Sequence, residues 1–328
     1  MSFTILLPVH GYSPWLCESV ESVITQESKD WKLLIADDGS DDKTKQWLQA
    51  KLFELEDKRV EWIKRPVNLG LFRNLNQAIK ESSTDWILLL CSDDKLHPDA
   101  ITSLEKLHQK WPVAGLILSS FDSMNADGSQ RPPDSSRHHD ELRVETGLVA
   151  PEQMIPALLR LGSLNGNLTG MAFNKRHWIE AGPFREDWRH AADWEWLIRA
   201  SEIKPLLLNR TSIASVRTHA QQLSVRNRKS GHECLEVAAV VSSLLEHPAL
   251  KDEPQKRKWA GHVMQFQLWN LLKSASGGDW GQWQAGIQAI HESAGIRQTL
   301  MCLMGWLPKR IKKWGHAKTT KNISCNSL

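Results

Sequence analysis

Short apolar segments alternate with helical segments along the first 120 residues, and this alternation restricts the fold more than any other feature of the sequence. The apolar runs are residues 3–9 (FTILLPV), 31–36 (WKLLIA), 60–63 and 85–91 (DWILLLC), and a helical spacing occupies residues 71–82. Short, wholly apolar strands separated by helices are typical of a parallel sheet that is covered on both faces. We therefore predict an α/β fold with a mostly parallel central sheet flanked by helices.

The later part of the chain is less regular. A further strand is expected near residues 114–121, and the polar stretch 125–140 is interpreted as a mobile loop or a hairpin. The pattern is helical from about residue 230 onward. We expect a main domain over residues 1–228 and a helical C-terminal extension over residues 229–328.

Composition excludes several classes of protein. The net charge of +3 over 328 residues is too small for a nucleic-acid partner, which needs a concentrated basic surface. Five scattered cysteines without a C-x-x-C pair indicate a reducing compartment. The N-terminus MSFTILLPVHGY has no positively charged start, and no stretch reaches the ~18 apolar residues of a membrane span. The expected location is the cytoplasm.

Polar residues follow three of the predicted strands in succession. They are Pro8 to His10, Asp37-Asp38, and Ser92-Asp93-Asp94. Sheets of this kind bind ligands outside the carboxyl ends of their strands. These three segments are therefore the first candidates for a binding site.

The adjacent carboxylates Asp93 and Asp94 follow the most apolar of these strands. They repel each other and lose hydration there, and a divalent cation would offset that cost. Mg²⁺ and Mn²⁺ prefer oxygen ligands and are commonly held by one or two carboxylates plus substrate phosphates. The alternative, that the two acids cap a helix beginning near Pro98, stays open at this point.

The second acidic pair, Asp37-Asp38, has the same position after its strand. A carboxylate here can accept hydrogen bonds from a nucleobase or a ribose, and Gly39 lets the backbone pass close to a ligand. Asp-Asp-Gly-Ser is also a common turn, so this pair alone does not decide between binding and structure.

The order of these motifs resembles glycosyltransferase family 2. The resemblance rests on a first strand ending PVHG, then LLIADDGSDD, NLGLFRNLNQAI and WILLLCSDDKLHPDAI, and it covers about residues 3–225. It implies the GT-A fold, a UDP-, dTDP- or GDP-sugar donor, Mg²⁺ or Mn²⁺ as cofactor, and inversion at the anomeric carbon. It also implies a nucleotide-sugar-binding half over residues 1–120 and an acceptor half over residues 121–228.

Carried over to this sequence, the resemblance assigns the donor site. It implies that Pro8 and His10 contact the nucleoside, that Asp38 with Asp37 holds the base, and that Arg73 lies on the nucleotide.

The family's D-x-D-like motif falls on Ser92-Asp93-Asp94. The resemblance implies that Asp94 binds the metal and that Ser92 and Asp93 belong to the nucleotide-sugar site, with Asp93 on the ribose or the sugar. Ser92 stands where the motif usually has a carboxylate. It further implies that His219 reaches the metal or the diphosphate, although a lone histidine is more often structural. Arg217 is expected to neutralise phosphate charge.

The acceptor side corresponds to LNGNLTGMAFNKRHWIEAGPFRED and HAADWEWLIRAS. Asp193 falls on the position of the family's catalytic base, with Glu195 as the second choice, and Ala192 replaces the glutamate that usually precedes the base. Gly166 and Gly170 would allow close backbone approach. From the residues alone, Asp193 could instead be a carboxylate that stabilises a helix start.

The resemblance predicts a metal-dependent inverting glycosyltransferase that moves a sugar, with a UDP-sugar favoured, to the hydroxyl of a saccharide or a lipid-linked saccharide. Assembly of bacterial-type cell-surface polysaccharide or glycolipid is the expected setting. One rival hypothesis is a nucleotidyltransferase, which would be expected to have a Gly-rich phosphate loop after the first strand; the segment PVHGYSPW is not such a loop. The other is a nonenzymatic nucleotide-sugar-binding module, which Ala192 supports.

The C-terminus joins an apolar stretch carrying Trp306 to a basic run. The run holds Lys309, Arg310, Lys312, Lys313 and Lys318. Such a segment suits peripheral contact with the inner face of an anionic membrane, and it equally suits a terminal helix packed on the protein.

Overall fold

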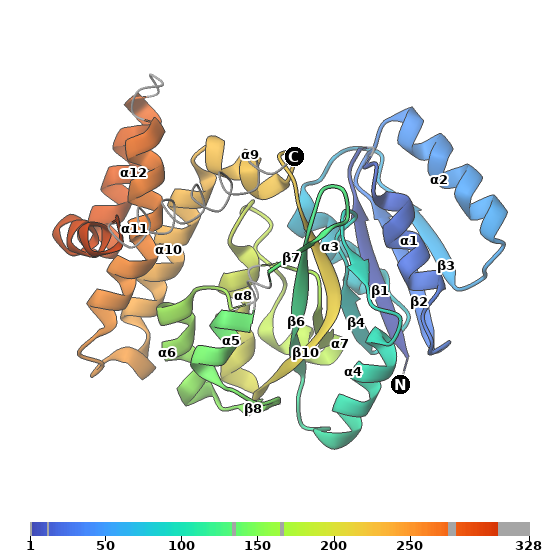
Figure 1. The fold of residues 1–328 in the computed structure, drawn as a ribbon, viewed down its shortest axis with the longest axis horizontal. Coiled ribbons are helices and arrows are strands. Elements are labelled where there is room, and N and C mark those ends of the chain that lie inside the picture. The colour runs from blue at the N-terminus through green and yellow to red at the C-terminus, as the bar shows by residue number, and fades with distance from the viewer. Residues whose placement is uncertain (1, 12, 133–135, 165–166, 275–279, 308–328) are drawn as a thin grey trace, which may run out of the picture. The chain divides into compact units, whose positions relative to one another are not determined.

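In the computed structural model, which describes residues 2–11, 13–132, 136–164, 167–274 and 280–307, a ten-stranded sheet organises the first of two units (Figure 1). The units divide between Arg226 and Asn227. The strands are β1 (Phe3–Val9), β2 (Trp31–Asp37), β3 (Val60–Lys64), β4 (Trp86–Leu89), β5 (Lys95–Leu96), β6 (Leu116–Asn125), β7 (Gln130–Arg131), β8 (Gly147–Val149), β9 (Met171–Asn174) and β10 (Leu206–Thr218). The helices are α1 (Leu16–Ile24), α2 (Asp42–Leu55), α3 (Leu71–Glu81), α4 (Ala100–Lys110), α5 (Ser136–Leu142), α6 (Pro151–Leu161), α7 (Lys175–Ala181) and α8 (Ala192–Ile203), with α9 (Leu223–Lys229) after β10.

The strand order is β3-β2-β1-β4-β9-β6-β10-β5, with β7 paired to β6 and β8 paired to β10. β3, β2, β1 and β4 are mutually parallel, and so are β6 and β10. The expected α/β architecture with helices around a central sheet is therefore confirmed. β9 was not predicted, and it runs antiparallel to both β4 and β6 in the middle of the sheet.

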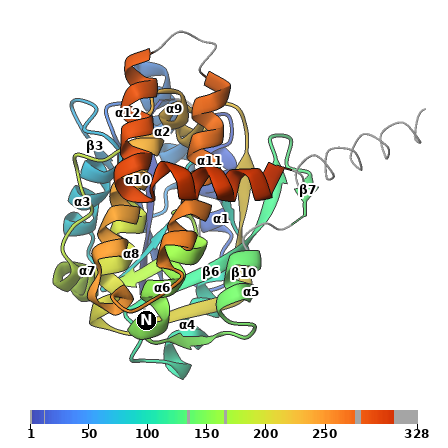
Figure 2. The same cartoon turned by 90° about the vertical axis from the view of Figure 1, so that its left-hand side faces the viewer.

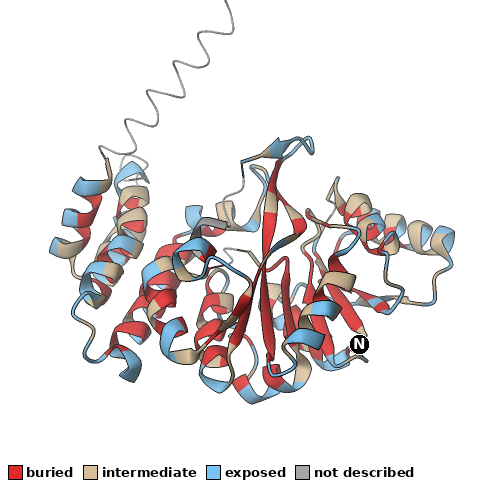
Figure 3. Cartoon of the chain, turned by 60° about the horizontal axis from the view of Figure 1, so that its bottom comes forward, coloured by how far each residue is buried: buried red, intermediate tan, exposed pale blue. Residues whose placement is uncertain are grey.

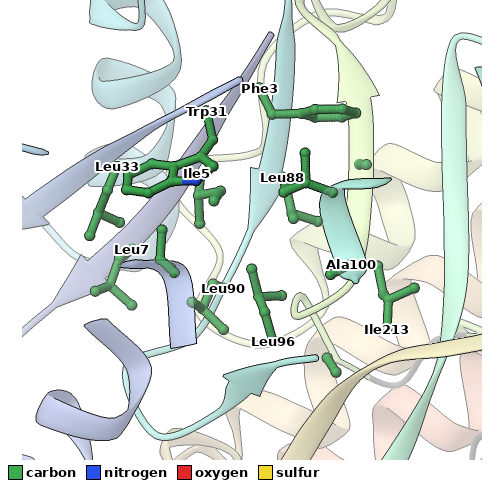
Figure 4. Close-up of a cluster of buried hydrophobic side chains, with 14 of the residues drawn as sticks. Phe3, Ile5, Leu7, Trp31, Leu33, Leu88, Leu90, Leu96, Ala100 and Ile213 are labelled. Atoms are coloured by element: carbon green, nitrogen blue, oxygen red, sulfur yellow. The ribbon is translucent and has the colours of Figure 1, made fainter. Parts of the chain in front are cut away.

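One face of the sheet is covered by α1, α2 and α4. Successive side chains of a strand point to opposite faces, so alternate residues of β1 and β2 share this cluster. Figure 4 shows Ile5 and Leu7 of β1 beside Leu33 of β2 and Leu88 of β4, all of them buried. The helices add Leu16, Val20, Val23, Leu48, Ala100, Ile101 and Leu104. Each fully buried aliphatic side chain stabilises the fold by roughly 1.5–3 kcal/mol.

A second group of buried side chains joins β9, α3 and α8. Phe184 lies 5.8 Å from Phe72 and 5.0 Å from Trp196 between ring centroids, and Phe173 lies 5.1 Å from Trp196. Figure 3 shows that the buried residues concentrate on the strands and on the inner sides of the helices. These tilted aromatic contacts fix the start of α8 against the sheet.

The polar stretch 125–140 contains a hairpin, as one of the two interpretations predicted. β7 pairs with the end of β6, with Ser123 opposite Arg131 and Met124 opposite Gln130. The short helix α5 lies in the same stretch, and residues 133–135 fall outside the described residues.

The second unit is helical, as expected. It contains α10 (His232–Glu246), a 3₁₀ turn at Pro248–Leu250, α11 (Lys256–Ser274), α12 (Trp280–Ser293) and a further helix over residues 296–307, drawn in red in Figure 2. A buried carboxylate on α10 joins two segments, because Glu233 accepts hydrogen bonds from Arg228 and from Gln267, each at 3.0 Å. Among the described helices, none is long and apolar enough to cross a membrane. The basic run after Leu307 lies outside the described residues.

Candidate functional site

The carboxyl ends of the parallel strands meet at one edge of the sheet, where the polar segments of the sequence lie. Val9 at the end of β1 is in register with Asp37 at the end of β2. β9 runs in the opposite direction, so the residues that precede it reach the same edge. The amide of Gly170 accordingly donates to the carbonyl of Leu89 at 3.2 Å. Segments distant in sequence therefore converge at this edge.

Asp38 organises the loop that leads into α3. Its carboxylate accepts hydrogen bonds from the amides of Leu69 at 2.6 Å and Gly70 at 3.0 Å, and only 4% of the residue is exposed. Its carbonyl oxygen lies 2.9 Å from Nδ1 of His10, and Nε2 of the same ring lies 3.0 Å from the Asn68 amide. His10, which is exposed, and residues 68–70 thus form one continuous surface around Asp38.

Asp37 is buried directly beneath this loop. Its Oδ1 accepts the amide proton of Ser40 at 2.9 Å, whereas its Oδ2 has no hydrogen-bond partner among the described residues. Gly39 takes a φ of 67°, and a Cβ there would lie 2.6 Å from the backbone nitrogen of Asn68. Only glycine fits this turn without displacing the 67–70 backbone.

Two further predicted donor-site residues lie nearby. Pro8 is half-buried within β1, where it is in register with Ala36 of β2. Arg73 projects from the first turn of α3, is 53% exposed, and lies 3.7 Å from the Glu186 carboxylate.

The acidic cluster, defined here as Cys91, Asp93 and Asp94, follows β4. A thiol or carboxylate atom from each residue lies within 4.8 Å of the others. Asp93 and Asp94 do not cap a helix, because α4 begins at Ala100 with Asp99 at its N-cap position. The capping alternative is therefore wrong.

Asp94 is the buried member of the acidic cluster. Its Oδ2 accepts hydrogen bonds from the Thr169 hydroxyl at 2.5 Å and the Asn167 amide at 3.2 Å, and its Oδ1 accepts the Arg217 amide proton at 2.8 Å. Burial, with the charge of Asp93 as the second cause, raises the pKa of Asp94 to about 7 despite these donors. Burial likewise raises the pKa of the Cys91 thiol well above its usual range.

Asp93 is the more accessible carboxylate, with 22% of its side chain exposed. Its Oδ2 lies 2.8 Å from Nε2 of His219. Nδ1 of that ring accepts the amide proton of Gln221 at 3.2 Å, so the ring proton belongs on Nε2. His219 therefore donates to Asp93, and the imidazole orients this carboxylate.

Arg217 is a structural residue of the site. Its side chain is 1% exposed and donates to the carbonyls of Asp93 at 2.9 Å and Ala126 at 3.0 Å and to the Glu18 carboxylate at 2.8 Å. The expectation that Arg217 neutralises a phosphate is wrong, because the guanidinium is enclosed by these partners. It ties α1, the acidic cluster and the β6–β7 turn together.

The acidic cluster suits a hard divalent cation. Carboxylate oxygens are the ligands that Mg²⁺ and Mn²⁺ prefer. Asp93 and Asp94 repel each other, and the pKa of Asp94 is raised; a bound cation would relieve this repulsion. Asp93 has Oδ1 available beside its bond to His219, and three protein donors hold Asp94 in place. Ser92 adds no carboxylate, and its carbonyl accepts a hydrogen bond from Ser13 at 3.2 Å.

The two candidate bases differ in their surroundings. Asp193 lies in the first turn of α8, half-buried, and its Oδ1 accepts the Trp194 amide proton at 2.9 Å. Glu195 is held in a two-point ion pair by Arg199, with Nε and Nη2 each 2.8 Å from a carboxylate oxygen. Arg199 is itself bound to the carbonyl of Pro183 at 2.9 Å. This two-point pairing engages both carboxylate oxygens of Glu195 within its own helix.

Sequence reasoning missed several residues that build the site. Thr169 and Asn167 hold Asp94, Glu18 pairs with Arg217, and the Trp15 ring lies 4.3 Å from the His219 ring between centroids. Cys91 was read only as a scattered cysteine, although its place immediately before Ser92-Asp93-Asp94 was a usable signal. Gly166 lies outside the described residues, and Gly170 has a φ of 88° at the edge of the sheet.

Comparison with known proteins places this site in a family. The family model described as "Glycosyl transferase family 2" matches residues 4–176, more than half of the chain. The putative glycosyltransferase EpsE of Bacillus subtilis (strain 168) is 27% identical over 131 residues, which cover 39% of this chain and 46% of EpsE. The teichoic acid poly(glycerol phosphate) polymerase of Staphylococcus epidermidis is 27% identical over 198 residues, which cover 60% of this chain and 25% of that protein. The chain thus spans less than half the length of either relative.

Solved structures share the fold at low sequence identity. The S. aureus TarS 1-349 complex with UDP-GlcNAc has a TM-score of 0.66 and 13% identity, covering 93% of this chain and 84% of that one. Mannosyltransferase PcManGT from Pyrobaculum calidifontis, in complex with GDP-Man and Mn²⁺, has a TM-score of 0.55 and 12% identity, covering 92% and 86%. The fold, the ordered strand-end motifs and the family match agree, and the chain belongs to glycosyl transferase family 2.

Proposed function

We propose that this chain is a metal-dependent inverting glycosyltransferase that moves a sugar from a nucleotide-diphosphate sugar to an acceptor hydroxyl. The observation that carries the proposal is the pair Asp93 and Asp94 at the sheet edge, held by donors from two separate segments, residues 167–169 and 217–219. A UDP-sugar is the favoured donor, and the TarS complexes with UDP-GlcNAc and UDP support that choice.

Asp93 and Asp94 are the residues that would hold Mg²⁺ or Mn²⁺, as the Mn²⁺ complex of PcManGT supports. A cation bound there supplies positive charge to the departing diphosphate. His219 keeps Asp93 oriented through its Nε2 proton, and Thr169 favours the ionised form of Asp94 through its hydroxyl. Both residues hydrogen-bond to the carboxylates that would hold the metal, as the residues that orient metal ligands usually do.

The donor nucleotide is assigned to the surface around Asp38. His10 and Pro8 would contact the nucleoside, and Arg73 would contribute a guanidinium from the exposed side of α3. Asp38 would accept a hydrogen bond from the nucleobase and also hold the amides of Leu69 and Gly70. Asp37, being buried, would support this turn from below.

Asp193 is proposed as the base that activates the acceptor. It removes the proton of the acceptor hydroxyl while the oxygen attacks the anomeric carbon from the side opposite to the leaving diphosphate. A single displacement of this kind inverts the anomeric configuration. Arg199 holds Glu195, two residues away, in a two-point ion pair.

The proposed setting is the assembly of a cell-surface polysaccharide or glycolipid, with a saccharide or lipid-linked saccharide as acceptor. The names of two relatives support it, the teichoic acid polymerase and the putative teichuronic acid biosynthesis glycosyltransferase TuaG of Bacillus subtilis (strain 168), which is 26% identical over 144 residues.

The test combines donor binding with transfer. Thermal-shift measurements with UDP-, GDP- and dTDP-sugars, each with and without Mn²⁺, should show stabilisation by one nucleotide class that depends on the metal. Asp193→Asn should retain that binding and lose transfer by roughly 10²–10⁴-fold, the usual contribution of a general base.

Glu195→Gln is the matched control, because it changes the neighbouring carboxylate of the same helical turn. It should keep transfer within a few-fold. Unchanged transfer by Asp193→Asn, or metal-independent binding of all three donors alike, would refute the assignment.

A further inference from the structure

The last described helix, residues 296–307, exposes an almost wholly apolar face. Leu300 is 41% exposed, Met301 54% and Met304 63%, and the spacing of three and four residues places them on one side with exposed Arg297. The opposite side packs on α11, since Cys302 is buried and its Sγ lies 3.8 Å from the carbonyl of Lys258. We call the exposed side, Arg297, Leu300, Met301 and Met304, the terminal face.

An aromatic pair lies where this helix meets the end of α11. Trp306 and Trp269 stand edge to face with centroids 6.2 Å apart, and the ammonium of Lys273 lies 5.7 Å from the Trp269 ring centroid. Leu272, next to this lysine, is 47% exposed. Indole rings with an adjacent lysine and exposed aliphatic chains are the combination favoured at a boundary between water and lipid.

Charge is strongly segregated toward this end of the chain. Residues 256–328 contain eleven Lys and Arg against two Asp and Glu, although the whole chain has a net charge of only +3. After Glu292 the sequence contains no further acidic residue. Among the described residues, Arg297 lies on the terminal face and Lys273 lies beside the Trp269–Trp306 pair, so both contribute positive charge to this region.

We infer that the terminal face docks on an anionic lipid bilayer, with Leu300, Met301 and Met304 entering the interface and Lys273 and Arg297 meeting lipid phosphates. This inference does not rest on the proposed enzymatic function, because it concerns the second unit alone. Large exposed apolar patches rimmed by polar residues mark sites of interaction with proteins or membranes. Unbranched Met and Leu chains beside indoles and basic residues match a fluid, negatively charged surface, to which such segments bind through combined apolar burial and charge attraction.

The experiment measures sedimentation of the full chain with vesicles of phosphatidylcholine alone and of phosphatidylcholine mixed with phosphatidylglycerol. The chain should sediment with the mixed vesicles only, and raised salt should weaken the binding. Met301→Gln/Met304→Gln should reduce the partition coefficient by roughly tenfold or more, because two apolar side chains no longer enter the interface. Lys273→Gln/Arg297→Gln should reduce it roughly fivefold per charge.

Phe53→Gln is the matched control, because Phe53 is 79% exposed on α2 of the first unit and should not affect vesicle binding. All substituted side chains are exposed, and circular dichroism and thermal unfolding should confirm an unchanged fold. Absence of binding to anionic vesicles, equal binding to neutral ones, or binding that Met301→Gln/Met304→Gln leaves intact would overturn the inference. So would self-association without lipid that this double variant abolishes, which would assign the face to a second copy of the chain.

Discussion

His219 donates a hydrogen bond through Nε2 to the Asp93 carboxylate, 2.8 Å away, and its ring lies tilted against that of Trp15 with centroids 4.3 Å apart. His219→Phe keeps an aromatic ring beside Trp15 and removes the donor. Loss of such an orienting contact typically weakens a metal site 10–100-fold, and we expect a loss of roughly that size in Mn²⁺ affinity, measured by calorimetry with UDP present.

A double-mutant cycle separates this role from a general effect on folding. Asp93→Asn should itself weaken Mn²⁺ binding, and His219→Phe added to Asp93→Asn should cost little more, because the two residues act through one contact. Fully additive losses would show that His219 acts independently of Asp93.

Cation binding should depend on pH through Asp94. Burial raises the pKa of Asp94 to about 7, so the carboxyl is protonated below that pH and must lose its proton before it can serve a cation. Mn²⁺ affinity should therefore fall by roughly tenfold for each pH unit below the pKa and level off above it.

Thr169→Val provides the complementary test of the same group. It removes the 2.5 Å hydrogen bond that favours ionised Asp94, so the pKa should rise further and the affinity curve should move to higher pH. A curve that does not move would exclude Asp94 as the titrating group.

Arg217 should matter for stability. Arg217→Met leaves the carbonyls of Asp93 and Ala126 without their donor and removes the partner of Glu18, and we expect a loss of about 2–4 kcal/mol in the free energy of unfolding by urea. The control Arg73→Met, on a side chain 53% exposed, should stay within about 0.5 kcal/mol. Unchanged stability of Arg217→Met would instead fit a ligand-binding arginine.

Gly39 and Gly11 allow a matched test of the turn beneath Asp38. Both have left-handed backbones, with φ of 67° and 77°, but a Cβ on Gly39 would overlap the backbone of Val67 and Asn68 whereas a Cβ on Gly11 meets nothing within 4 Å. Gly11→Ala should lower the free energy of unfolding by about 1–2 kcal/mol, because an alanine is strained in the left-handed conformation. Gly39→Ala should lower it distinctly more, because its Cβ would also overlap the neighbouring backbone. Equal losses in thermal unfolding would contradict a steric role for Gly39.

The sequence predicted the parallel half of the sheet well, because each of β1, β2, β3 and β4 coincides with a local run of apolar residues. It also located Asp37, Asp38, Asp93 and Asp94 at strand ends, since parallel strands share one edge. β9 escaped prediction, because four residues, MAFN, carry too little pattern to distinguish a central strand from a loop.

The support of the acidic cluster could not be predicted, because its contacts are distant along the chain. Thr169 is 75 positions from Asp94, and Glu18 is 199 positions from Arg217. An arginine near a histidine gives no local sign that it will be enclosed, so Arg217 was assigned to a phosphate. Likewise the pairing of Glu195 with Arg199 is visible from the helical spacing of four, but its further anchoring at Pro183 is not.

The hydrogen bonds of the Asp94 carboxylate come from residues that lie later in the chain. Asp94 is made long before Thr169 and Arg217, the residues that complete its hydrogen bonds. A nascent chain that ends at β6 contains Asp94 but not yet Thr169 or Arg217, which donate hydrogen bonds to it. Until these residues are synthesised, water must solvate the Asp94 carboxylate. The hydrogen bonds of Asp94 therefore cannot be completed before Arg217 has been synthesised.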